Sequence, residues 1–280
     1  MKEIVARDWL HLQKLLFADQ WNDDIRRFRS NYAYRGINRA DYKLTTSLMR
    51  MGKPYPKMEQ NLLKQFQKYA HKHVVERDTE WHWLSIAQHH GLPTRLLDWT
   101  YSPYNALHFA TCALDDFKAD GAVWMVDFVG AHQLLQYSER ALLTEYGANI
   151  FSMDMLTRTM ENLEKLDSRH ASSFDCAIFF EPPTIDDRII NQFAYFSVLS
   201  DPQLAFDDWL ELPYVKRKVA SKKIVIPAAL KWEVRDKLDQ ANINERILLT
   251  GLDGLCAWLK RHYTPVPKPA PKRAKKKKKK

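Results

Sequence analysis

The chain is poor in cysteine and has no long apolar run, and each shortage excludes a class of protein. Its three cysteines, Cys112, Cys176 and Cys256, stand far apart without metal-type spacing, which argues against a disulfide framework and a structural zinc site. No stretch approaches the ~20 apolar residues that span a bilayer, and the first residues lack the apolar core of a signal peptide. We therefore expect a cytoplasmic protein that does not enter a membrane.

Acidic residues are missing from the C-terminal end. Residues 264–280 carry nine Lys or Arg side chains, which equals the formal net charge of the whole 280-residue chain, +9. Residues 1–263 are therefore neutral overall and have no general basic footprint for nucleic acid. Alternating prolines and six final lysines predict a disordered tail drawn to nucleic acid without sequence choice. The alternative is that the lysines only aid solubility.

Aromatic residues are abundant, and the apolar periodicity divides residues 1–263 into helices and strands in irregular order. Helices are expected over 57–72, 80–90, 103–114 and 228–238, with a last one around Leu255–Leu259. Strands are expected over 32–36, 94–99, 122–128, 176–181 and 223–226. Because the two kinds of element do not alternate regularly, the pattern favours one α+β domain with a mixed sheet.

The first candidate for chemistry is Arg35, in the short aromatic segment Tyr34-Arg35-Gly36. A buried Arg has to be paired, and its planar fork of donors matches phosphate or carboxylate. Tyr34 and Gly36 are expected to contact the same ligand, since a glycine would let that ligand approach the backbone closely. The alternative is an internal salt bridge to an Asp or Glu, and Glu181 is one candidate for that partner.

The second candidate is the polar segment 88–103, which joins two expected helices. Polar side chains this dense before a helix N-terminus are typical of a site, because that terminus offers free N–H groups to an anion. The alternative is that they cap helices and form turns, with Arg95 and Asp98 as a plain ion pair. Adjacent histidines on a helix point about 100° apart and cannot chelate one ion, so no metal is expected. The candidate residues are His89, His90, Arg95, Asp98, Thr100 and Ser102.

The third candidate is Glu181, at the end of an apolar strand and before two prolines that hold the backbone extended. Such a carboxylate is aimed rigidly, which suits a functional acid. Gln192 follows in the segment Arg188 to Phe196.

These segments together resemble the FRG domain family. The resemblance rests on Tyr34-Arg35-Gly36, on the stretch AQHHGLPTRLLDWT at 87–100, on 180–196 and on 252–255, and it covers roughly residues 25–263. The chain departs from the family pattern at Ala194, where members commonly have Gly.

A weaker similarity connects the same layout to Arg-Ser-Glu ADP-ribosyltransferases. It implies that Arg35 grips the phosphates of NAD, that Thr100 and Ser102 order the pocket, and that Glu181 or Gln192 stabilises the ribosyl cation. NAD would then be the substrate of an ADP-ribosyltransferase or glycohydrolase that acts as a toxin or phage-defence effector. The competing hypothesis is a non-catalytic sensor that binds a nucleotide or nucleic acid in the same pocket.

Overall fold

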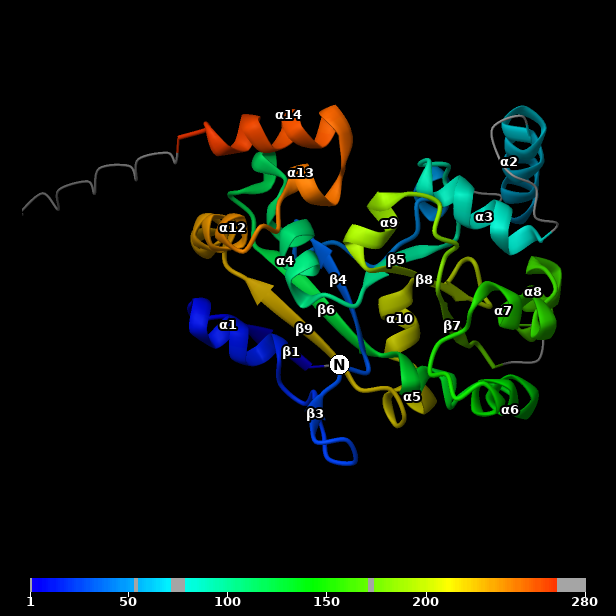
Figure 1. Cartoon of the computed structure of the whole chain (residues 1–280). Helices are drawn as coiled ribbons and strands as arrows, with labels where there is room; N and C mark the ends of the chain where they lie inside the picture. Colours follow the sequence, from blue (N-terminus) through cyan, green and yellow to red (C-terminus); the bar gives the residue numbers. More distant parts are fainter. Residues whose placement is uncertain (1, 53–54, 72–78, 171–173, 266–280) are drawn as a thin grey trace, which may run out of the picture.

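The computed structural model describes residues 2–52, 55–71, 79–170 and 174–265 (Figure 1). Its centre is a seven-stranded sheet in the order β1-β9-β6-β4-β5-β8-β7. β1 and β9 are parallel and every other neighbouring pair is antiparallel. The strands are β1 (Lys2–Val5), β4 (Tyr32–Ile37), β5 (Leu97–Thr100), β6 (Gly121–Asp127), β7 (Ala177–Phe180), β8 (Ala194–Leu199) and β9 (Ser221–Ile226), and a separate hairpin pairs β2 (Trp21–Asn22) with β3 (Arg27–Phe28).

Helices cover both faces of the sheet because side chains of its central strands alternate between two cores. On β6, Val123 packs with one face and Trp124 with the other. The first face is covered by α1 (Trp9–Leu16), α4 (Pro103–Thr111) and α12 (Lys231–Gln240). The second is covered by α5 (Phe128–His132), α10 (Phe206–Leu210) and α11 (Pro213–Lys216).

A third core lies at the β7 edge of the sheet, where several helices gather (Figure 1). These are α2 (Tyr55–Ala70), α3 (Glu80–His89), α6 (Tyr137–Glu145), α7 (Met153–Thr159) and α8 (Leu163–His170). The remaining elements are α9 (Asp187–Gln192), α13 (Glu245–Leu248), α14 (Gly251–His262) and the short 3-10 turns η1 (Met49–Met51), η3 (Leu114–Asp116) and η4 (Ala228–Leu230). Across the described ranges, no helix has both the length and the apolar character needed to cross a membrane.

The expected α+β architecture with a mixed sheet is confirmed, and local signals placed several element ends correctly. The Ser102 side chain accepts a hydrogen bond from the Asn105 N–H and caps α4, with Pro103 at its first position. Gly91 follows α3 with a φ of +83°. The strand expected over 94–99 begins only at Leu97, and the tail predicted from 264 falls mostly on 266–280, outside the described residues.

Candidate functional site

A cavity of about 1070 Å³ lies beside β4 and β5 and is closed by the end of α3, the segment 42–50 and the start of α9. The structure brings most of the predicted site residues to its wall. Three come from β4, namely Tyr34, Arg35 and Gly36, and two come from the end of α3, His89 and His90. Another three are Asp98 and Thr100 of β5 and Gln192 of α9. Segments separated by more than 150 positions therefore share one hollow.

Arg35 is a partly buried cation of this wall, with 21% of its side chain exposed. Its Nη1 donates to the backbone carbonyl of Asp98 and lies 3.6 Å from the Asp98 Oδ2. Its Nε is buried and has no hydrogen-bond partner within the described part of the chain. Burial lowers the pKa of Arg35, Asp98 opposes that change, and the nearby positive charge of Arg50 adds to it. The contacts with Asp98 therefore leave the Nε donor of Arg35 without a hydrogen-bond partner among the described residues.

Gln88 fixes the carboxylate that faces Arg35. Its Nε2 donates to both Asp98 oxygens, at 3.0 and 2.9 Å, and its Oε1 accepts from the Thr94 hydroxyl at 2.6 Å. Because Gln88 belongs to α3 and Asp98 to β5, this chain of bonds holds the helix end against the strand. Asp98 is therefore an oriented partner of Arg35 at the cavity wall.

Cations outnumber carboxylates around the cavity. Besides Arg35 and Asp98, its wall includes Lys43, Arg50 and Arg188 with a single further carboxylate, Asp186. Lys43 pairs with Asp208 outside the wall at 2.9 Å. No carboxylate within the described residues forms an ion pair with Arg50 or Arg188. The cavity is therefore suited to an anionic ligand.

Residues 30–119 match the family model of the FRG domain. The chain contains an FRG domain. The matched range runs from just before β4 to just beyond η3, so it holds Arg35, Arg50 and the whole 88–103 segment. No curated protein and no solved structure matches the chain. The family resemblance expected over 25–263 is confirmed for this range, and Glu181 and Gln192 lie beyond it.

Glu181 is the main predicted residue that the structure leaves outside the cavity. Its side chain is exposed and its Oε1 accepts a hydrogen bond from the Tyr101 hydroxyl at 3.2 Å. The predicted alternative of an internal salt bridge at Arg35 is present, but its partner is Asp98 and not Glu181. After Glu181 the chain leaves β7 through two prolines. The extended backbone at Glu181 therefore does not direct its carboxylate toward Arg35.

The predicted hydroxyls mainly hold the backbone together. Thr100 Oγ1 donates to the Gln192 carbonyl at 2.6 Å and accepts from the Ser102 N–H at 3.0 Å. Ser102 caps α4 and is not part of the cavity wall. The Gln192 Nε2 donates to the Leu248 carbonyl of α13 at 2.7 Å. Thr100 and Gln192 thus join β5, α9 and α13 at the cavity wall.

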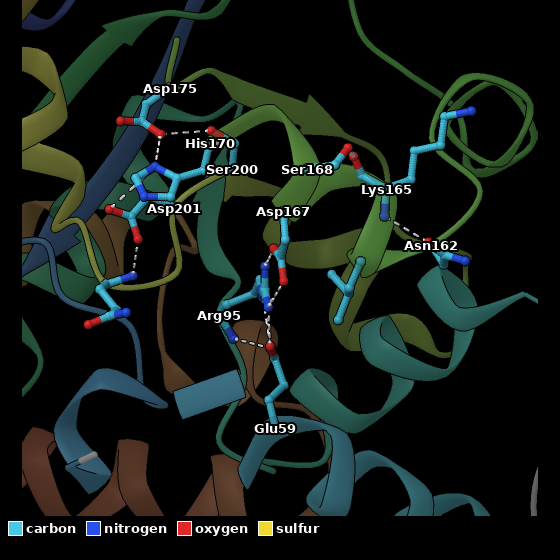
Figure 2. A network of polar contacts seen from close by, with 12 residues as sticks. Glu59, Arg95, Asn162, Lys165, Asp167, Ser168, His170, Asp175, Ser200 and Asp201 are labelled. Atoms are coloured by element: carbon cyan, nitrogen blue, oxygen red, sulfur yellow. Dashed lines mark hydrogen bonds and ion pairs between the residues drawn. The ribbon is translucent and has the colours of Figure 1, made fainter. Parts of the chain in front are cut away.

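Arg95 is a structural residue of the FRG domain and is absent from the cavity wall. Figure 2 shows it between Glu59 of α2 and Asp167 of α8, with 3% of its side chain exposed. Its Nε donates to the Glu59 Oε2 at 2.7 Å, and its Nη1 pairs with Asp167. Burial alone would lower the pKa of Arg95, but the two carboxylates raise it above the ordinary value. The prediction that Arg95 binds the ligand of this cavity is therefore not supported, and the alternative of a plain ion pair with Asp98 is wrong.

Gly36 lines the cavity, but its missing side chain has a different role from the predicted one. A Cβ at this position would lie 1.8 Å from the Ala106 carbonyl oxygen and 2.7 Å from the Ala110 nitrogen. The space of the missing side chain is filled by α4, so the glycine serves helix–sheet packing and not the close approach of a ligand.

His89 is held by Asp186, at 2.8 Å between Nε2 and Oδ2. Asp186 also caps α9 by accepting from the N–H groups of Arg188 and Ile189. Burial would raise the pKa of Asp186, but the His89 contact and the cap lower it overall. This pair links the α3 end to α9 across one side of the cavity.

One group of described residues has the arrangement of possible metal ligands, and it lies away from the cavity. His170, Asp175 and Asp201 hold their ligand atoms within 4.8 Å of one another (Figure 2). His170 Nδ1 lies 2.8 Å from the Asp175 Oδ1 and 3.9 Å from the Asp201 Oδ2. These contacts raise the pKa of His170, as expected for an imidazolium that neutralises two carboxylates.

Proposed function

We propose that the FRG-domain cavity binds a nucleotide-type ligand and that Arg35 grips its phosphate. One observation carries this proposal, namely the buried Arg35 Nε without a hydrogen-bond partner in the described chain. Leaving such a donor unsatisfied costs roughly 1–3 kcal/mol, which a phosphate oxygen would recover. The guanidinium offers phosphate two parallel N–H donors, a geometry that an ammonium lacks.

The size of the cavity and its aromatic rim support a nucleoside attached to that phosphate. A volume of about 1070 Å³ accommodates a mononucleotide or dinucleotide. Tyr42 lines the cavity with 53% of its surface exposed, and the Arg39 guanidinium lies 5.2 Å from its ring centroid. A base would stack on such a ring with an energy of about 1–3 kcal/mol.

NAD is a candidate ligand, and binding is better supported than cleavage. Cleavage of the nicotinamide bond needs a carboxylate beside the ribosyl cation, and Glu181 does not line the cavity. Asp98 and Asp186 do, but both already pair with Arg35 and His89. A toxin or phage-defence effector acting by ADP-ribosyl transfer or glycohydrolysis would have to use one of these two.

The test compares ligand binding with turnover in the same preparations. We expect NAD and ADP to raise the melting temperature of the full chain, and the Arg35→Gln variant to lose this effect while keeping its ligand-free melting temperature within a few degrees. Arg140→Gln removes the same charge from the exposed surface of α6 and should behave as the parent. Failure of every nucleotide to stabilise the parent would reject the proposal.

Nicotinamide release, measured in parallel, separates the two functions. A non-catalytic sensor releases none. Nicotinamide release that is lost in Asp98→Asn or Asp186→Asn but kept in Glu181→Gln would establish cleavage. It would also assign the catalytic carboxylate to the cavity wall instead of Glu181.

The basic end of the chain supplies a second binding function. Its nine positive charges without any acid favour nucleic acid as a partner of residues 264–280. Deleting these residues should abolish the retention of the protein on double-stranded DNA at low salt. Unchanged retention in the deletion variant would overturn this assignment.

A further inference from the structure

We infer that Arg50 is a second phosphate-binding residue and that, with Arg35, it selects ligands carrying a diphosphate over those carrying a single phosphate. The inference rests on the proposed nucleotide function and names the class of ligand that the cavity takes.

Arg50 is presented to the cavity from the turn η1, which follows the segment Thr45–Leu48. Its Nη1 donates to the Thr45 carbonyl at 2.7 Å, and Thr45 itself lines the cavity. This bond orients the guanidinium while using one of its five N–H donors. No carboxylate of the described residues forms an ion pair with the remaining donors of Arg50.

Arg35 and Arg50 belong to the wall of the same cavity. Both line the cavity, and the positive charge of Arg50 contributes to the lowered pKa of Arg35. Two like charges brought together without an intervening acid repel each other, and Asp98 approaches Arg35 alone. An anion with oxygens on two adjacent phosphorus atoms removes this repulsion by contacting both cations, whereas a single phosphate on Arg35 leaves Arg50 without a partner.

Neighbouring residues support the same ligand class. Lys43 also lines the cavity, but its ammonium is engaged by Asp208 at 2.9 Å. Arg188 comes from α9, a separate segment of the wall. Arg50 is the cation of this wall whose charge acts on Arg35, and its loss should affect the second phosphate more than the first.

The experiment measures the affinities of ADP, AMP, inorganic pyrophosphate and inorganic phosphate by calorimetry, using the full chain and its Arg50→Gln and Arg140→Gln variants. We expect the parent to bind ADP at least ~10-fold more tightly than AMP, as one extra charge-assisted contact implies. Arg50→Gln should weaken ADP and pyrophosphate about 10-fold and AMP less than about twofold, and Arg140→Gln should change neither.

The outcomes distinguish this inference from the proposed function. Absence of binding by all four probes would reject the nucleotide pocket itself. Equal affinities for ADP and AMP in the parent, or an equal loss of both in Arg50→Gln, would overturn the diphosphate inference and leave the pocket standing. Should Arg50→Gln fail to fold, Arg50→Met keeps an unbranched apolar side chain without the charge, and an unchanged ADP-to-AMP ratio in that variant would also overturn it.

Discussion

The Arg35 Nη1 lies 3.6 Å from the Asp98 Oδ2, so the cation proposed to grip a phosphate already faces a carboxylate of the neighbouring strand. Gln88 holds that carboxylate by both oxygens and prevents it from turning away. A bound phosphate therefore has to share Arg35 with Asp98. Asp98 thus stabilises a half-buried guanidinium while limiting its affinity for an anion.

The first prediction concerns this competition. Asp98→Asn removes the negative charge but keeps an oxygen that Gln88 can bond, so we expect the affinity for ADP to rise about three- to tenfold. Calorimetric titration measures the change, and Asp236→Asn on the exposed face of α12 is the matched control. Weaker binding in Asp98→Asn would show that the carboxylate contacts the ligand instead of competing with it.

The second prediction concerns the contact between Gly36 and α4. Gly36→Ala places a methyl group 1.8 Å from the Ala106 carbonyl oxygen, so the helix has to move. We expect the free energy of unfolding to fall by about 3 kcal/mol or more in urea titrations. Gly147→Ala, where a Cβ meets open space at a φ of +58°, should cost only about 1 kcal/mol. Equal losses in the two variants would contradict the packing role.

The third prediction separates Arg95 from the cavity. Arg95→Gln leaves the Glu59 carboxylate buried without its cation, which is expected to lower the free energy of unfolding by about 3–5 kcal/mol. Nucleotide affinity, measured well below the melting temperature, should stay within twofold of the parent, because Arg95 is absent from the cavity wall. A selective loss of nucleotide binding at unchanged stability would show that Arg95 takes part in ligand binding.

The fourth prediction is a pH dependence of stability that originates at His132. Burial lowers the pKa of His132 to about 4, against a weaker opposing effect of its bond to Asn149. The ring is neutral in the folded protein, with Nδ1 at 2.9 Å from the Asn149 carbonyl oxygen and Nε2 accepting from the Phe179 N–H at 2.9 Å. Below pH 6.5 the unfolded chain binds a proton that the folded chain refuses, so stability falls as the pH drops toward 4.

The expected loss from His132 between pH 6.5 and 5 is about 2 kcal/mol. It is measured by urea unfolding at the two pH values in the parent and in His132→Gln, which carries no titratable group. The variant is less stable at both values but should show a pH difference smaller by about that amount. An identical difference in the two proteins would assign the pH dependence to other groups.

Elements governed by neighbouring residues could be predicted from the sequence. The start of α4 at Ser102-Pro103 and the end of α3 before Gly91 depend on hydrogen bonds and backbone angles within a few residues. The alternation along β6 depends on the strand period alone. The same reasoning named Arg35 and the segment 88–103 as candidates, and both contribute residues to the cavity wall.

Partners far apart in the chain were decided only by the tertiary structure. Arg95 pairs with Glu59 and Asp167, which are 36 and 72 positions away, and Arg35 faces Asp98 instead of Glu181. The sheet order sets these contacts for Arg35, since β5, which carries Asp98, pairs with β4, whereas β7, which precedes Glu181, lies at the edge of the sheet beyond β8. The amino-acid sequence by itself determined the local elements and the charge of the tail, because those depend on short-range geometry and composition. Which cation meets which anion depends on how distant segments pack, and the folded sheet alone decides that.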